Sequence, residues 1–237
     1  MLQYFDKIVR GSEHEDNLLI LQYLKSMIGK KFSFLNYYKE IPVSYDATLL
    51  GVENEMAEFE IHEYQAKVIN LDRKTLIYSH KDCPVKEDIF CEAFYINVPK
   101  KRVILCKFEY SRIRSTLRRF VRVVLGKSVE ADLIVENDIL PAQIRDVSLG
   151  GASAQVASCE LLTQGLTLNV FLKLPDISTG AIIEVGTSAT IVKIYGDNEP
   201  FTCILEFHPE KHSQQQLSYY INQRQVEIIK ELKELNL

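Results

Sequence analysis

Residues 140–157 read LPAQIRDVSLGGASAQVA, two short β-rich runs on either side of the glycine pair Gly150-Gly151. Runs of this length with alternating or β-branched apolar residues are typical of strands, and paired glycines are typical of the turn that joins two strands. The stretch therefore predicts the end of one strand, a tight turn and the start of the next strand.

The rest of the C-terminal half continues this pattern. Further β-rich runs are VEADLIVE, LTLNVFLKL, AIIEVGTSATIVKIYG and FTCILEF, with turn signals at Asn137-Asp138, Gly165, Pro175-Asp176, Gly180 and Gly196-Asp197. Short strands at this spacing without interleaved helices predict a small closed antiparallel barrel. A long terminal helix follows, in which one face carries Leu217, Ile221, Ile228, Leu232 and Leu235.

The N-terminal half predicts a second β domain. The segment NLLILQYLKSMIGKK, from Asp16 or Asn17 to a stop at Gly29, has the apolar spacing of an amphipathic helix. Residues 30 to about 110 then consist of β-rich runs, AKVIN among them. The predicted fold is mainly β, with two small antiparallel barrels in tandem: a domain over 1–110, a basic linker over 111–123, and a barrel with its helix over 124–237.

Composition limits the class of protein. No run approaches the roughly 20 apolar residues that span a bilayer, and the first residues do not resemble a signal peptide, so we expect a cytoplasmic protein. The five cysteines are widely spaced, which favours reduced thiols over a disulfide framework or a zinc site. The histidines are scattered, although His208 and His212 lie four residues apart, and we expect no metal site.

Charge is distributed unevenly. Residues 100–127 hold ten Lys or Arg and the single acid Glu109, which gives this segment a charge of +9. Because the net charge of the whole chain is −4, all other residues together carry −13. An acidic remainder would weaken attraction to a long polyanion, whereas a small anion responds to the local field. The pattern favours a nucleotide ligand over a nucleic acid.

Two motifs carry the candidate chemistry. The first, at the end of the basic segment, is Arg118-Arg119-Phe120-Val121-Arg122. Arg118 and Arg122 share a face in either a strand or a helix, and each guanidinium can donate a forked pair of hydrogen bonds to phosphate or to the O6 and N7 edge of guanine. An ordinary solvated basic face is the alternative.

The second motif is Asp146-Val147-Ser148-Leu149-Gly150-Gly151. Asp146 and Ser148 point to one side of a strand, where a carboxylate can accept from guanine N1 and N2 and a hydroxyl can donate or accept. The glycines permit a tight turn and close approach of a flat base. The alternative is a plain hairpin turn in which Asp and Ser bond to their own backbone.

Together, RxxxR followed by DxSxxG, a β series and a terminal helix resemble the PilZ domain family over about residues 112–225. The resemblance implies a six-stranded barrel that binds cyclic di-GMP, with Arg118, Arg119, Arg122, Asp146, Ser148 and Gly151 as ligand-binding residues. One departure is the last strand, Phe201–Phe207, which lacks the glycine common there in the family. The N-terminal half resembles YcgR-like flagellar-brake receptors in architecture only.

The function expected from this resemblance is a cyclic di-GMP receptor that catalyses nothing and needs no cofactor. Repulsion among the linker arginines, including Arg114, would be relieved by the ligand, which would change the domain arrangement and so regulate a protein partner in motility, attachment or biofilm formation. A homo-oligomer through the terminal helix stays open. The alternatives are a single-stranded nucleic-acid-binding barrel and a nucleotide hydrolase, although no nucleophile and base pair is recognisable.

Overall fold

A computed structural model describes residues 4–81, 84–113, 120–176 and 179–235. The chain divides into two compact units. The first comprises Met1–Tyr38, Pro42–Arg118 and Lys230–Leu237, and the second comprises Lys39–Ile41 and Arg119–Ile229.

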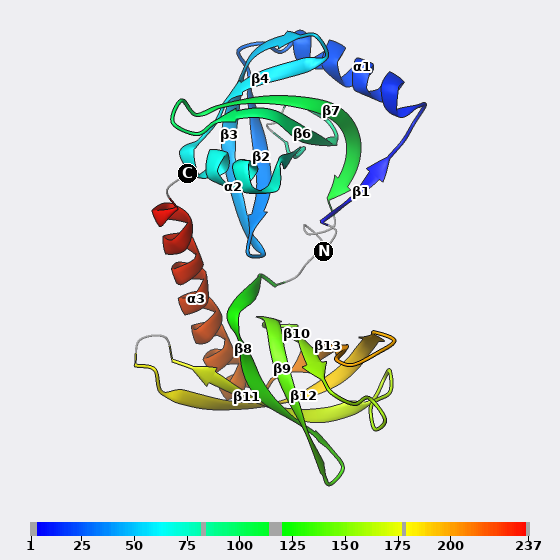
Figure 1. Ribbon diagram of the computed structural model, residues 1–237, viewed down its shortest axis with the longest axis vertical. Helices are drawn as coiled ribbons and strands as arrows, with labels where there is room; N and C mark the ends of the chain where they lie inside the picture. Colours follow the sequence, from blue (N-terminus) through cyan, green and yellow to red (C-terminus); the bar gives the residue numbers. More distant parts are fainter. Residues whose placement is uncertain (1–3, 82–83, 114–119, 177–178, 236–237) are drawn as a thin grey trace. The chain divides into compact units, whose positions relative to one another are not determined.

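The first unit is a closed antiparallel barrel with two helices. Its elements are β1 (Phe5–Ile8), α1 (Glu13–Lys25), β2 (Lys31–Tyr38), β3 (Ile41–Glu53), β4 (Met56–Glu60), α2 (Glu63–Asp72), β5 (Lys74–Ile77), β6 (Asp88–Asn97) and β7 (Arg102–Ile113). Within the described residues, the sheet order is β1-β7-β4-β3-β2-β5-β6, and β6 also pairs with β7, which closes the barrel and leaves β1 as an added edge strand (Figure 1).

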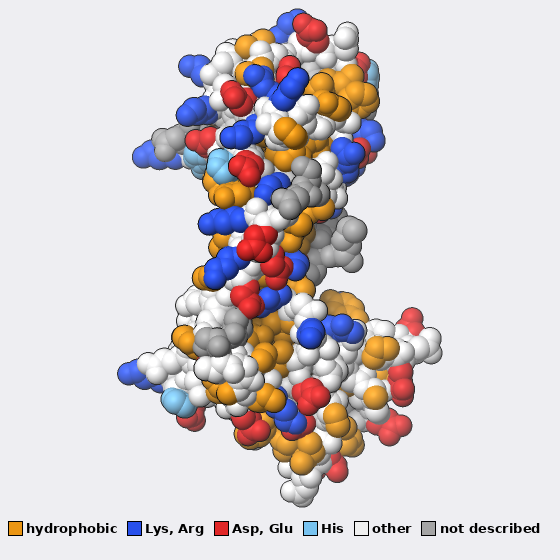
Figure 2. Space-filling model, turned by 60° about the vertical axis from the view of Figure 1, so that its left-hand side comes forward, with side chains coloured by type: hydrophobic (Ala, Val, Ile, Leu, Met, Phe, Trp, Pro, Cys, Tyr) orange, Lys and Arg blue, Asp and Glu red, His pale blue; other side chains and the backbone are white. Residues whose placement is uncertain are grey.

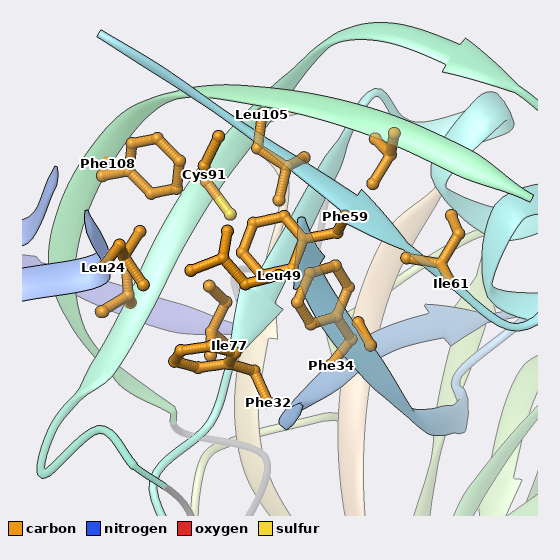
Figure 3. Close-up of a cluster of buried hydrophobic side chains, with 14 of the residues drawn as sticks. Leu24, Phe32, Phe34, Leu49, Phe59, Ile61, Ile77, Cys91, Leu105 and Phe108 are labelled. Carbon is orange, nitrogen blue, oxygen red and sulfur yellow. The ribbon is translucent and has the colours of Figure 1, made fainter. Parts of the chain in front are cut away.

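Aromatic and branched side chains fill this barrel. Phe32 and Phe34 of β2, Phe59 of β4 and Phe108 of β7 are at most 1% exposed. The Phe34 and Phe59 rings meet edge to face with centroids 5.0 Å apart, an arrangement that aromatic pairs favour. Figure 3 shows these rings with Leu49, Ile77 and Leu105 gathered around them, and Leu24 of α1 reaches the same cluster.

Helix α1 is confirmed, but it begins earlier than predicted and ends at Lys25, before the predicted stop at Gly29. Ser12 is its N-cap and accepts from the Glu15 backbone N–H, while the Glu15 side chain accepts from the Ser12 N–H. This reciprocal pair satisfies two backbone donors that a helix start leaves unpaired. The Ser-x-x-Glu spacing, and not the first apolar residue, therefore sets where the helix begins.

The prediction of a strand at AKVIN was wrong, because residues Glu63–Asp72 form α2. The His62 side chain accepts from the Tyr64 N–H at the start, and Arg73 ends the helix in a left-handed conformation. Residues Gln65 to Ile69 are all buried. A helix buried on consecutive positions shows no amphipathic period, and its β-branched Val68 and Ile69 then resemble a strand.

The second unit is the predicted C-terminal barrel. Its strands are β8 (Arg122–Val135), β9 (Asp138–Ser148), β10 (Gly151–Val156), β11 (Thr167–Pro175), β12 (Ile182–Tyr195) and β13 (Phe201–His208). Helix α3 (Lys211–Glu234) follows and belongs to this unit up to Ile229. In the part that the structure describes, the strands close in the order β10-β13-β12-β11-β8-β9, every pair antiparallel (Figure 1). The mainly β fold with two six-stranded barrels is thus confirmed for the described residues.

Helix α3 confirms the predicted terminal helix and its apolar face. Leu217, Ile221, Ile228 and Leu232 are each at most 5% exposed, so the seam packs inside the chain. Ser213 donates to the carbonyl of Gly186 on β12 (2.6 Å), which fixes the start of the helix to the barrel. Among the described helices, none combines the length and apolar character that crossing a bilayer requires.

The capping box of α1 supplies a first prediction. Ser12→Ala should lower the free energy of unfolding by about 1 kcal/mol, because the Glu15 N–H loses its acceptor. Since the two side chains act as one unit, adding Glu15→Ala should cost less in the Ser12→Ala background than in wild type. Urea denaturation of the four proteins measures this coupling, and strictly additive losses would contradict it.

Candidate functional site

The predicted site residues fall on three adjacent strands of the second unit. Arg122 begins β8, Asp146 and Ser148 end β9, and Gly151 begins β10. Arg118 and Arg119 lie outside the described residues. The structure therefore brings four of the six predicted residues to one end of the β8, β9 and β10 strands.

Strand register aligns these residues. Arg122 pairs with Ser148 and Val124 with Asp146 across β8 and β9. On the other side of β9, Ser148 pairs with Gly151, so the turn between the strands consists of Leu149 and Gly150. The same register places Ser153 of β10 directly opposite Asp146.

A β-bulge at Arg145 decides which way Asp146 faces. Ser153 pairs with Asp146, but its neighbour Ala154 pairs with Ile144, so Arg145 has no partner in the ladder. Ile144 and Val147 are both fully buried although they are three residues apart. An extra residue shifts the alternation of a strand. Asp146 and Ser148 consequently lie on the face opposite to Val147 and away from the barrel core.

The Asp146 carboxylate is buried and has two different environments. The residue is 8% exposed. Its Oδ2 accepts a short hydrogen bond from the Ser153 hydroxyl. Its Oδ1 forms an ion pair with the Arg122 guanidinium, with 3.3 Å from Nε to Oδ1, and has no hydrogen-bond partner among the described residues. A buried carboxylate oxygen without a hydrogen bond is costly to maintain and is ready to accept one from a ligand.

Ser148 behaves as the hairpin alternative predicted. Its hydroxyl donates a hydrogen bond to the Gly151 carbonyl across the turn (3.1 Å). The residue as a whole is 8% exposed. A hydroxyl has lone pairs left after donating, so Ser148 can still accept a hydrogen bond. Asp146 does not follow that alternative, because the contacts that the structure gives it are to the side chains of Ser153 and Arg122.

The two glycines of the turn have separate steric roles. A Cβ on Gly151 would lie 2.0 Å from the Leu205 carbonyl oxygen of β13, and the residue has φ +155°. A Cβ on Gly150 would lie 2.8 Å from Cδ2 of Phe120, so the aromatic ring that precedes Arg122 by two residues packs on this turn. Gly150 therefore leaves room for the Phe120 ring on the turn between β9 and β10.

This arrangement suits a ligand that is both anionic and rich in N–H donors. The Arg122 side chain is 23% exposed and can donate to phosphate or a base edge beside the ion pair. The Asp146 carboxylate can accept the N–H groups that guanine presents along its N1 and N2 edge. Both groups lie within one patch because register and bulge place them there.

Sequence reasoning missed Ser153. The signal was present, because a two-residue turn after Ser148 fixes which residues face each other on the two strands. Counting back from that turn gives Ser153 as the partner of Asp146. The bulge at Arg145 left no such signal, since nothing in QIRDV distinguishes an extra residue from a regular strand.

A metal site and a reactive cysteine are the other candidate chemistries among the described residues. No group of three or more His, Cys, Asp or Glu side chains there could hold a metal ion. Cys91 and Cys203 are buried free thiols, whereas Cys106 and Cys159 are partly exposed; Cys83 lies outside the described residues. Burial raises the pKa of the Cys203 thiol to about 11, with a smaller effect from Cys159, so this group is a poor nucleophile at neutral pH.

The family model of the PilZ domain matches residues 116–223. No curated protein sequence matches the chain. The structure is similar to Escherichia coli YcgR in complex with c-di-GMP (12% identity, TM-score 0.44, covering 98% of this chain and 97% of that chain).

Two further solved structures are similar. The inhibitor of motility MotI from Bacillus subtilis shares 16% identity with a TM-score of 0.44, over 84% of this chain and 97% of that chain. The MrkH complex with c-di-GMP from K. pneumonia shares 14% identity with a TM-score of 0.43, over 95% of this chain and 100% of that chain.

Close packing at Gly151 predicts a large stability loss on substitution. Gly151→Ala should lower the free energy of unfolding by about 3 kcal/mol, because both the Leu205 carbonyl and the positive φ oppose a Cβ. Gly165→Ala is the matched control, since Gly165 has φ +86° and open space around it, and it should cost only about 1 kcal/mol. Equal losses in urea denaturation would show that the contact with Leu205 does not constrain the turn.

Proposed function

We propose that the protein is a receptor that binds cyclic di-GMP at the Arg122 and Asp146 patch and does not transform it, because the family model of the PilZ domain matches residues 116–223. One observation carries the proposal. Asp146 holds a buried Oδ1 beside the Arg122 guanidinium, and this oxygen has no hydrogen-bond partner among the residues that the structure describes. A guanine dinucleotide can be bound by two kinds of group. One is a hydrogen-bond acceptor for the base, and the other is a guanidinium that donates a forked pair of hydrogen bonds to a base edge or a phosphate.

The contributions of the ligand-binding residues follow from their chemistry. Arg122 donates to phosphate or to the O6 and N7 edge of guanine, and Asp146 accepts from guanine N1 and N2. Ser148 offers an acceptor at the turn, and Gly151 permits the close packing on Leu205 that holds the turn in place. Arg118 and Arg119 complete the proposed set on sequence grounds and lie outside the described residues.

The finer part of the proposal concerns the response to the ligand. Cyclic di-GMP neutralises part of the positive charge on the basic segment, and we propose that this changes the arrangement of the two units and thereby regulates a protein partner. The basis is the charge pattern of the sequence, in which Arg114, Arg118, Arg119 and Arg122 follow one another closely. The similar proteins named above include an inhibitor of motility, which makes motility one candidate output.

A nucleic-acid interface has less support. On the face drawn in Figure 2, the Lys and Arg side chains of the described residues are interspersed with Asp and Glu. Nonspecific binding to a polyanion depends on many phosphate contacts made together. Within the described residues, the patch pairs the Arg122 guanidinium with the Asp146 carboxylate over a short distance, which favours a small ligand.

Calorimetric titration with cyclic di-GMP tests the proposed site. Arg122→Ala and Asp146→Asn should each weaken binding by about 1–3 kcal/mol, because each removes one side of the recognition pair. Arg145→Ala is the matched control: Arg145 adjoins Asp146 but donates to Gln155 (2.8 and 2.6 Å), so its loss should leave the affinity unchanged. Chromatography should recover the ligand intact after incubation.

Three outcomes would overturn this proposal. Wild-type affinity in both Arg122→Ala and Asp146→Asn would place the site elsewhere. A wild-type protein that binds oligonucleotides with a steep salt dependence but not cyclic di-GMP would favour a nucleic-acid function. Hydrolysis of the ligand would make the protein an enzyme.

The response of the two units needs a separate measurement. Small-angle scattering of the full chain with and without saturating cyclic di-GMP should give different distance distributions, because the ligand must prefer one arrangement to shift the population. Asp146→Asn at the same ligand concentration serves as the control. Identical curves for free and saturated wild type would refute the rearrangement while leaving ligand binding intact.

A further inference from the structure

We infer that Ser153 is a positioning residue, which lies outside both motifs and holds the Asp146 carboxylate in the orientation that selects guanine. The inference rests on the proposed function, because it concerns how the same carboxylate meets its ligand. Ser153 lies on β10, and Asp146 lies opposite it on β9.

The contact between the two side chains is buried and specific. Ser153 is 7% exposed and Asp146 is 8% exposed. A serine hydroxyl can donate one hydrogen bond, and the Ser153 hydroxyl donates it to Oδ2 of Asp146. Hydrogen bonds to an ionised acceptor are shorter and stronger than neutral ones, so this bond fixes the carboxylate firmly.

The bond gives the two carboxylate oxygens of Asp146 different partners. Oδ2 is held by Ser153, while Oδ1 lies 3.3 Å from Arg122 Nε without forming a hydrogen bond to any described residue. The terminal torsion of an aspartate is broad, so a carboxylate without a fixed oxygen samples many orientations. Ser153 on one side and Arg122 on the other therefore keep the plane of the group constant before a ligand arrives.

Orientation matters because guanine offers two donors side by side. The ring N1–H and the exocyclic 2-amino group can both reach a carboxylate only when its oxygens lie in the plane of the base. A carboxylate that rotates freely can still accept one hydrogen bond from guanine, but it rarely has the orientation that accepts both. Ser153 should therefore contribute most to the second hydrogen bond, the one to the 2-amino group.

The test compares two ligands that differ only in that group. Cyclic di-IMP keeps the N1–H but lacks the 2-amino group. Ser153→Ala should weaken binding of cyclic di-GMP about tenfold and change the binding of cyclic di-IMP much less, because hydrogen bonds to charged groups are worth about that factor. The preference for cyclic di-GMP over cyclic di-IMP, measured by calorimetry on the full chain, should fall accordingly.

Two further variants separate positioning from general stability. Ser153→Thr keeps the hydroxyl and should keep the preference for cyclic di-GMP. Thr187→Val removes a hydroxyl from an equally buried residue of the same barrel, 7% exposed, and should leave the preference unchanged even where thermal unfolding shifts. Titration reports the fraction of active protein, so partial unfolding of a variant does not imitate weaker binding.

The outcomes distinguish this inference from the proposed function. An unchanged preference in Ser153→Ala, in a wild-type protein that binds cyclic di-GMP, would overturn the role of Ser153 alone. Equal weakening for both ligands would make Ser153 a structural residue and also overturn it. Failure of the wild type to bind either ligand would overturn the proposed function and this inference together.

Discussion

The tight turn between β9 and β10 is the constraint on which the candidate site depends. Gly151 passes so close to the Leu205 carbonyl that no side chain fits, and the turn leaves only Leu149 and Gly150 between paired residues. A turn this short permits one register, because a slip of one residue would send every side chain to the opposite face. The partners of Asp146 and Ser148 are fixed by that register.

Burial of Asp146 in this frame carries an energetic cost that its neighbours only partly offset. A carboxylate removed from water needs a countercharge and hydrogen bonds, and Arg122 and Ser153 supply one of each kind. Oδ1 still lacks a hydrogen bond among the described residues. Incomplete satisfaction of a buried charge is a local departure from good packing, and such departures are expected where a protein binds its ligand.

Much of the fold could be predicted because strand residues alternate clearly. In β8 the buried positions Val129, Ala131, Leu133 and Val135 follow a period of two, and that pattern alone indicates a strand with one face in a core. Helix α2 could not be predicted this way, because its run of consecutive buried residues has no visible period. The start of α1 was misplaced because the apolar pattern was weighed above the Ser12 and Glu15 cap.

The site shows a different limit. Spacing in the sequence predicts which residues of one strand share a face. It predicts that Asp146 and Ser148 do so, because they are two residues apart in the same strand. It does not name residues that meet across strands, and Ser153 becomes visible only when the turn is used to set the register. Because of the bulge at Arg145, Ile144 and Val147 both pack inside the barrel, and the face with Asp146 and Ser148 therefore points away from the core. The motif therefore supplies the residues of the proposed site, whereas the turn, the bulge and the opposite strand set the orientation of their side chains.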